Sequence, residues 1–310
     1  MLLTPQFVTS RHVVALVFAR DARQPVLVVK IPRRPGDNGG VRREADVLRQ
    51  LRSAGGGGMP GIPEVVGLLD VGPHCVLVET ALAGAQLDPR QVAGDLAGAV
   101  EAGTSFLSQL PRTLPADSNK EWYERKIRRP LHGLSRMLPG DGEVGSLVER
   151  THKVLAPLRS VQLPAVVEHG DLSHPNLFLP DSGQLQVVDW ERASSDGVPG
   201  HDLVFYLQYL SESFEHAFTR SNQLKAFDKA FGPAGWGREP LREHLQMRGV
   251  DQDLIPLLII ATWARSAATL ADRLLVQEDQ SAGQVRAAVF SDRDFWLWRH
   301  VVDAPWQRPG

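Results

Sequence analysis

The sequence has little cysteine and no excess of charge. Its 310 residues include one cysteine, Cys75, and its formal net charge is -2. A single thiol excludes an internal disulfide and is typical of a reducing compartment, so we expect a cytoplasmic location. Without a basic excess, neither a nucleic acid nor an anionic membrane surface is expected as a partner.

Long apolar runs are also missing. The longest, from Leu254 to Ala264, is too short to span a bilayer and contains a proline, so it predicts a buried helix. The first twenty residues lack the basic segment and unbroken apolar core of a signal peptide and are typical of strands. We therefore expect a globular chain with no membrane partner, large enough for one large core or two smaller ones.

The patterns change near Ala81–Gly84. Before that point the chain alternates valine-rich strands, one helix and a second pair of strands, in the order His12–Arg20, Pro25–Pro32, Val41–Leu51, Val65–Val71 and Cys75–Thr80. After it, long helical patterns dominate, among them Pro89–Leu110. This predicts an α+β chain with a small β-rich lobe over 1–81 and a larger, mainly helical lobe over 82–310.

One segment of the helical part, from Val166 to Trp190, places polar residues beside apolar strands. Its two apolar arms flank Asp181-Ser182-Gly183, which is strong turn chemistry and predicts a hairpin. Since the arms are of similar length, Asn176 and Asp189 should lie side by side at their outer ends. Amide and carboxylate oxygens suit a hard cation such as Mg²⁺.

Asp171 lies five residues before Asn176 in the loop that follows an apolar strand. An aspartate next to a divalent site can accept a proton from an attacking hydroxyl. Each residue alone is typical of a turn or a cap, but the three at this spacing favour a catalytic site. A second interpretation, a metallohydrolase, would use His169, Asp171 and His174 as transition-metal ligands.

Two further charges stand where apolar residues are expected. Lys30 alternates onto one strand face with Val26 and Val28, and Glu44 falls on the apolar stripe of the following helix. A buried carboxylate needs a partner, and Lys30 on the adjacent strand is the natural one. Because buried ion pairs stabilise proteins poorly, a lysine held in place to contact phosphate is the better explanation.

These residues together resemble the aminoglycoside phosphotransferase and choline-kinase-like family, small-molecule relatives of protein kinases. The resemblance rests on four segments: HGDLSHPN, VVDWE, LVETALAGAQL and GHDLVFYL. It implies a protein-kinase-like, two-lobed fold and extends from about Lys30 to about Leu207. It also implies that Asp202, in the last segment, braces the catalytic loop.

The resemblance assigns roles to the metal and catalytic positions. Asp171 would be the catalytic base, and Asn176 and Asp189 would hold Mg²⁺. The expected reaction is transfer of the γ-phosphate of ATP to a hydroxyl of a small molecule of the aminoglycoside, sugar or amino-alcohol type. A protein substrate is less favoured, because the loop begins His-Gly-Asp rather than His-Arg-Asp.

The same resemblance predicts the nucleotide contacts. Lys30, oriented by Glu44, would hold the phosphates, and backbone groups from Glu79 to Ala81 would hold adenine. One element departs from the family: no glycine lies between Val8 and His12, where a glycine-rich phosphate loop is expected. This departure keeps open an alternative, a catalytically weak, nucleotide-binding pseudokinase or regulatory module.

The acceptor should bind in the helical lobe. Acidic and basic residues are nearly balanced from Glu212 to Arg308, so no acidic stretch points to a polycationic aminoglycoside. Trp296 and Trp298 are two residues apart and therefore face different ways on a helix, so at most one should line a pocket.

Overall fold

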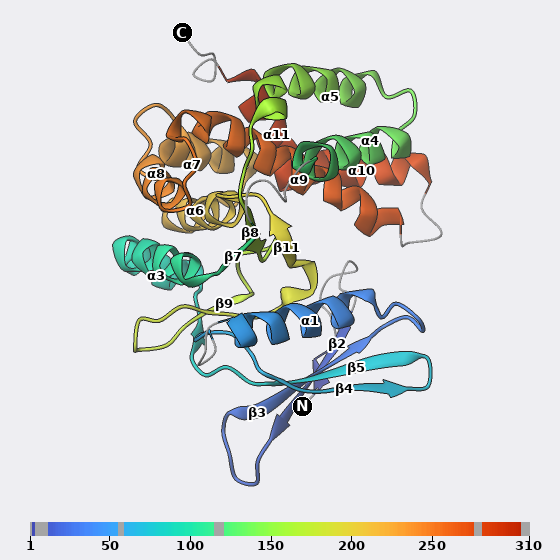
Figure 1. The fold of residues 1–310 in the computed structure, drawn as a ribbon, viewed down its shortest axis with the longest axis vertical. Coiled ribbons are helices and arrows are strands. Elements are labelled where there is room, and N and C mark those ends of the chain that lie inside the picture. The colour runs from blue at the N-terminus through green and yellow to red at the C-terminus, as the bar shows by residue number, and fades with distance from the viewer. Residues whose placement is uncertain (1, 4–11, 55–58, 115–120, 276–280, 305–310) are drawn as a thin grey trace. The chain divides into compact units, whose positions relative to one another are not determined.

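A computed structural model describes residues 2–3, 12–54, 59–114, 121–275 and 281–304. The chain divides into two compact units (Figure 1). The first combines Met1–Thr113 with Val166–Ser195, and the second combines Leu114–Ala165 with Asp196–Gly310. The predicted N-terminal lobe, residues 1–81, belongs to the first unit, which also takes in the segment with the hairpin and its polar residues.

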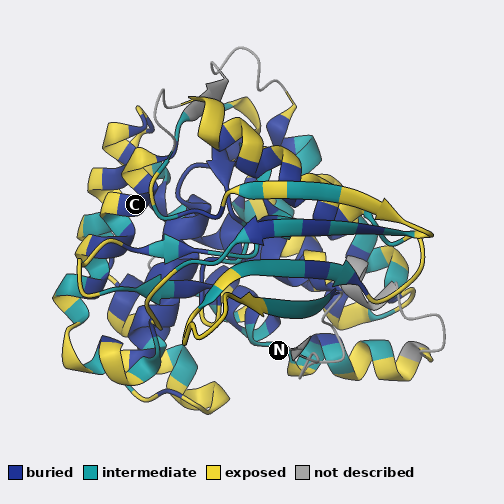
Figure 2. Cartoon of the chain, turned by 90° about the horizontal axis from the view of Figure 1, so that it is seen from below, coloured by how far each residue is buried: buried dark blue, intermediate teal, exposed yellow. Residues whose placement is uncertain are grey.

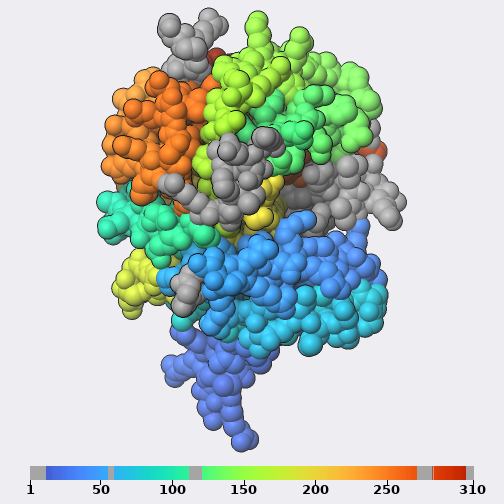
Figure 3. Space-filling model, viewed as in Figure 1, coloured from blue at the N-terminus to red at the C-terminus, as the bar shows by residue number. Residues whose placement is uncertain are grey.

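A five-stranded antiparallel sheet forms the base of the first unit, in the order β1-β2-β3-β5-β4. The strands are β1 (Leu2–Leu3), β2 (His12–Phe18), β3 (Pro25–Pro32), β4 (Val65–Val71) and β5 (His74–Thr80). The two predicted hairpins, β2–β3 and β4–β5, are confirmed. The turn between β2 and β3 is exposed and projects from the surface (Figure 3).

Helix α1 (Gly39–Ala54) contacts β3, β4 and β5 (Figure 1). Its apolar stripe packs Val41 and Ala45 against Cys75 and Leu77 of β5, and all four are fully buried. Several apolar side chains of the sheet stay exposed: Val17, Val26, Val66, Leu69 and Val71. Figure 2, which views the sheet from below, accordingly shows its strands largely in the colours of intermediate and exposed residues.

The predicted helix Pro89–Leu110 is wrong as a single element. It is divided into α2 (Pro89–Gly94) and α3 (Leu96–Gln109) at Asp95, whose backbone leaves the helical region at φ -150° and ψ 79°. The Asp95 carboxylate accepts a hydrogen bond from Gly98 N at 2.8 Å, which caps α3. Gly94 followed by a strong capping residue explains why the helix ends and restarts here.

The hairpin predicted between Asn176 and Asp189 is confirmed. Strands β9 (Leu177–Leu179) and β10 (Gln186–Val187) are antiparallel, with β6 (Ala85–Gln86) on the other side of β9. Val188 N donates to Asn176 O at 3.0 Å, so the two ends lie side by side as expected. Gly61 packs against this hairpin: its carbonyl accepts from Val187 N, and a Cβ there would lie 2.5 Å from Leu185 O.

The chain passes between the units through a short three-stranded sheet of β7 (Arg112–Leu114), β8 (Ala165–Glu168) and β11 (Ser194–Gly197). The other elements that the structure describes in the second unit are helices. Its α-helices are α4 (Arg129–Met137), α5 (Gly142–Val154), α6 (His201–Phe214), α7 (Arg220–Phe231), α8 (Arg238–Met247), α9 (Ile255–Leu275), α10 (Ala282–Ser291) and α11 (Arg293–Asp303). A π-helical turn, Glu124–Arg128, precedes α4, where Pro130 cannot donate a backbone hydrogen bond.

The apolar run Leu254–Ala264 forms the first half of α9, and Ile259 to Ala261 are fully buried. Among the described residues, Gln252–Leu270 is the one stretch whose length and composition would let it cross a membrane, and 67% of it is buried inside the protein. The core helix of a globular protein has the same length and composition, so the burial supports the predicted core helix.

Candidate phosphotransfer site

Lys30 lies at the centre of a buried cluster of carboxylates in the first unit. Its ammonium nitrogen is 2.6 Å from Glu44 Oε1 and 3.3 Å from both Glu79 Oε1 and Asp189 Oδ1. Lys30, Glu44 and Glu79 are 5%, 0% and 1% exposed, whereas the Asp189 side chain is 38% exposed. The predicted pair of Lys30 and Glu44 is therefore present, and two more acids join it.

Strand register explains why these charges meet. Lys30 is paired with Val14 and Leu77, and Glu79 is two residues from Leu77 on β5. Since side chains two residues apart share a face, Glu79 and Lys30 are diagonal neighbours on one face of the sheet. The buried positions of β5 are Cys75, Leu77 and Glu79, so the carboxylate takes the third place in an apolar alternation.

Glu44 connects α1 to the loop that contains Asp189. Its Oε1 accepts from Lys30 Nζ and also from the backbone N–H of Trp190 at 2.8 Å. The Trp190 ring is fully buried and packs edge-on to His169, with ring centroids 4.8 Å apart. Asp189 itself has a left-handed backbone, φ 69° and ψ 60°, an uncommon conformation for a residue other than glycine. Strained backbone of this kind concentrates at functional sites.

Burial and charge oppose one another in the cluster. Burial by itself would lower the pKa of Lys30, but Glu44, Glu79 and Asp189 raise it well above its usual value. Burial raises the pKa of Glu44 to about 8 and also raises that of Glu79, while the Lys30 charge acts in the other direction on both. For Asp189, burial is outweighed by Lys30 and by the nearby histidines, which lower its pKa. One ammonium thus faces more acid than it can neutralise.

The catalytic loop is built around His169. The Asp171 N–H donates to His169 Nδ1 at 3.2 Å, and His169 Nε2 lies 3.0 Å from Val188 O. Both ring nitrogens are therefore occupied, and burial lowers the pKa of His169. A neutral imidazole that braces the loop explains its position. Among the residues that the structure describes, no three His, Cys, Asp or Glu side chains gather into a group that could hold a metal, which leaves the metallohydrolase interpretation without support.

Arg192 contacts the proposed catalytic carboxylate, a pairing that was not predicted from the sequence. Its Nη1 lies 3.2 Å from Asp171 Oδ2, with the two side chains 31% and 29% exposed. Gly170 holds the two segments together: at φ +81° it places its Cα so close that a Cβ would be 3.1 Å from Arg192 O. The sequence did contain a signal for this pair, because Arg192 lies three residues after Asp189. A cation so close to the expected metal position is a candidate partner for the Asp171 carboxylate.

The oxygens predicted to bind Mg²⁺ are suitable for that ion. Asn176 is 6% exposed, and its Nδ2 donates to the Asp171 carbonyl at 3.1 Å, which fixes the amide and leaves Oδ1 as the remaining acceptor. Asp189 offers a carboxylate with a lowered pKa that stays ionised. One amide and one carboxylate oxygen are the few protein ligands that Mg²⁺ accepts when substrate phosphates complete its shell.

The segment predicted to hold adenine begins at Glu79. Thr80 N donates to Glu64 O and Ala81 N to Val26 O, so both of these N–H groups already serve the sheet. Leu82 is the next residue, and its N–H makes no hydrogen bond to any other residue described by the structure. The stretch 8–12, where the glycine-poor phosphate loop was predicted, lies outside the described residues up to His12, the first residue of β2.

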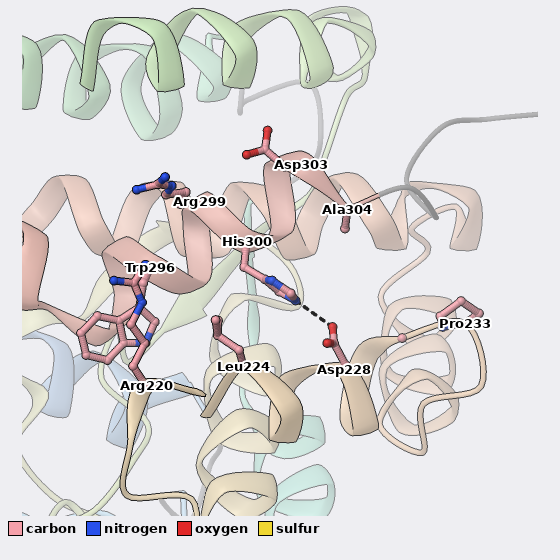
Figure 4. Close-up of a pocket in the computed structure, with 10 residues that line it drawn as sticks. Arg220, Leu224, Asp228, Pro233, Trp296, Arg299, His300, Asp303 and Ala304 are labelled. Carbon is pink, nitrogen blue, oxygen red and sulfur yellow. Dashed lines mark hydrogen bonds and ion pairs between the residues drawn. The ribbon is translucent and has the colours of Figure 1, made fainter. Parts of the chain in front are cut away.

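A separate cavity of about 550 Å³ lies between α7 and α11 in the second unit (Figure 4). Trp296 lines it beside Arg220, whereas Trp298 is fully buried, which confirms that at most one of this pair lines a pocket. In the same cavity, His300 Nε2 lies 2.8 Å from Asp228 Oδ1, so these two side chains already contact each other (Figure 4). The cavity has the size of a small-molecule site.

Comparison with protein families identifies the chain. Residues 13–244 match the phosphotransferase enzyme family, which is more than half of the sequence. The chain belongs to this family. A search of curated proteins returned no match.

Solved structures agree on the fold. A thermostable mutant of the aminoglycoside phosphotransferase APH(4)-Ia, in a ternary complex with AMP-PNP and hygromycin B, superposes with a TM-score of 0.58 at 13% identity, over 98% of this chain and 94% of that one. The choline kinase LicA from Streptococcus pneumoniae gives 0.53 at 13% identity, over 98% and 94%. The Plasmodium vivax ethanolamine kinase Pv091845 gives 0.57 at 10% identity, over 96% and 82%. The predicted protein-kinase-like fold is therefore confirmed, and family and fold together support a small-molecule phosphotransferase.

Proposed function

We propose that the chain transfers the γ-phosphate of ATP to a hydroxyl group of a small molecule in a reaction that requires Mg²⁺. The observation that carries this proposal is the Lys30 ammonium held by Glu44 at 2.6 Å and placed 3.3 Å from Asp189. A buried lysine beside an ionised aspartate is the pairing that nucleotide phosphates and their metal need. Related folds in complex with ATP or AMP-PNP support the choice of nucleotide.

Each residue of the site has a role that its contacts support. Asn176 Oδ1 and the Asp189 carboxylate would hold Mg²⁺, which when bound neutralises charge on the phosphates. Lys30 would donate hydrogen bonds to phosphate oxygens while Glu44 fixes its direction. Positioning and neutralisation of charge supply most of the catalysis in this reaction class, so a rigid arrangement of these groups is the main requirement.

Asp171 would orient the acceptor hydroxyl and accept its proton. Arg192, at 3.2 Å, would keep the carboxylate in one orientation, and the hydrogen bond from the Asp171 N–H to His169 fixes the backbone beneath it. These contacts would hold Asp171 in one position, as a general base requires.

Adenine would lie along the segment after Glu79. Since the N–H groups of Thr80 and Ala81 are used within the sheet, Ala81 would contribute its carbonyl, and Leu82 N–H would be the donor to the base. Asp202 is the second residue of α6 in the second unit and is 5% exposed.

The proposed acceptor class rests on likeness to proteins that share the fold. Aminoglycoside phosphotransferases and choline or ethanolamine kinases share the fold, so we propose an aminoglycoside, a sugar or an amino alcohol as acceptor. The chain's own residues favour no member of this set, and a substrate panel must decide among them.

Isothermal titration with ATP and Mg²⁺ tests the proposal. The wild-type chain should bind the nucleotide at micromolar to millimolar concentration, and Asp189→Asn should lose the dependence of binding on Mg²⁺. No binding at millimolar ATP would overturn the proposal. Binding without slow ATP hydrolysis, or hydrolysis unchanged in Asp171→Asn, would instead indicate the pseudokinase alternative.

A further inference from the structure

Glu79 is the carboxylate of the Lys30 cluster that the proposed reaction leaves without a role, since only its backbone was assigned to the nucleotide. The side chain is 1% exposed and its Oε1 lies 3.3 Å from Lys30 Nζ. Its other oxygen, Oε2, is buried and has no hydrogen-bond partner among the described residues. A buried carboxylate in an apolar alternation is costly, so its retention calls for a reason other than stability.

Lys30 is enclosed by acids. Its ammonium donates hydrogen bonds to Glu44 Oε1 at 2.6 Å and to Asp189 Oδ1 at 3.3 Å, and Glu79 Oε1 lies 3.3 Å from the same nitrogen as an ion-pair partner. A phosphate oxygen that approaches Lys30 therefore meets the negative charge of these acids. Glu44 has the shortest contact and also binds Trp190 N, so it is the least easily displaced.

We propose that Glu79 is a second anchor of Lys30 that competes with the nucleotide phosphates and thereby makes their binding depend on the metal. This inference rests on the proposed function. When a divalent cation binds the Asp189 carboxylate, the Lys30 N–H that Asp189 accepted becomes available to a phosphate oxygen. Glu44 and Glu79 would still contact the ammonium from two sides and hold it in place. Without the cation, Asp189 keeps its hydrogen bond to Lys30 and the excess of acid repels the phosphates.

The negative charge of Glu79 determines how much this residue should weaken the binding of a metal-free nucleotide. A phosphate on the far side of the ammonium would be roughly 6 Å from the Glu79 carboxylate, which is the 3.3 Å of the ion pair plus about 2.8 Å for a charged hydrogen bond. At an effective dielectric constant of about 20, two charges at that distance change a dissociation constant by roughly a hundredfold. Since the nucleotide brings its own counterions, we expect at least about a tenfold effect on binding without metal.

Titration of ADP into Glu79→Gln and wild type, in EDTA and in excess Mg²⁺, tests the inference. Gln has the same shape but is a weaker acceptor, so the variant should bind metal-free ADP at least about tenfold more tightly. With Mg²⁺ the two proteins should differ less than about threefold. Glu64→Gln, which removes an exposed glutamate close to β5, is the matched control and should match wild type in both conditions.

Three results would overturn the inference. Equal affinity of Glu79→Gln and wild type for metal-free ADP would mean that Glu79 carries no charge that opposes phosphate. A lower melting temperature with unchanged affinities would show a purely structural role. If the wild type binds no nucleotide even with Mg²⁺, the proposed function fails and this inference fails with it. The first two results leave the proposed function intact, so the two failures can be told apart.

Discussion

Replacing Glu44 tests whether the first unit depends on one buried acceptor. Glu44 is fully buried and accepts from Lys30 Nζ at 2.6 Å and from Trp190 N at 2.8 Å. In Glu44→Ala the Trp190 N–H loses its acceptor, which costs about 1–3 kcal/mol. Removing one partner of a buried ion pair costs about 3–5 kcal/mol, but Lys30 keeps Glu79 and Asp189. We therefore expect a total loss of about 3 kcal/mol in the free energy of unfolding.

Glu44→Gln is the matched variant. Gln keeps an acceptor for the Trp190 N–H and fills the same space, so the expected loss is only about 1 kcal/mol. Urea unfolding followed by tryptophan fluorescence measures both values. A Glu44→Ala variant within about 0.5 kcal/mol of wild type would refute the reasoning, because the buried hydrogen bonds would then contribute nothing. If the two variants lost the same free energy of unfolding, the loss would come from the missing charge and not from the hydrogen bond with Trp190 N.

Three further predictions concern other parts of the chain. Gly61→Ala should destabilise by about 2 kcal/mol or more, because its Cβ would lie 2.5 Å from Leu185 O at a φ of +80°. Gly72→Ala, at φ +59° with open space around it, should lose only about 1 kcal/mol in the same urea titration. Burial lowers the pKa of His244 from 6.5 to about 4, so the unfolded chain takes up the proton first. Stability should thus fall by up to about 3 kcal/mol as the pH drops from 6.5 to 4, and unfolding of His244→Gln across this range should lack that slope. Arg192→Gln should lower kcat about tenfold with KM for ATP unchanged, and Arg192→Lys should restore part of it; a change in KM alone would contradict the positioning role.

The sequence predicted the parts of the site in which a charge interrupts an apolar pattern. Lys30 within a strand and Glu44 on a helical stripe predicted each other, since burial demands a partner. The hairpin was equally predictable, because arms of similar length fix where Asn176 and Asp189 end. In both cases the local sequence pattern and the tertiary structure point to the same arrangement, so the pattern alone was sufficient.

The features that could not be predicted from the sequence mostly depend on contacts between segments that are distant along the chain. The Glu79 side chain gave the same signal as Lys30, a charge in an apolar alternation, but the family resemblance drew attention to its backbone. The pair of Arg192 and Asp171 arises from the close approach of two loops at Gly170, which periodicity does not report. The break at Asp95 was missed because capping by Asp95 competes with a helical pattern that continues across it.

Phosphoryl transfer itself is the most direct test of the central claim. The chain would be incubated with ATP and Mg²⁺ and a panel of aminoglycosides, sugars and amino alcohols, and each acceptor would be weighed by mass spectrometry. At least one acceptor should gain the mass of one phosphoryl group, and Asp171→Asn should abolish that gain while it still binds ATP. Full transfer by Asp171→Asn, or ATP binding with no acceptor modified across a broad panel, would contradict the claim that this site phosphorylates a small-molecule hydroxyl.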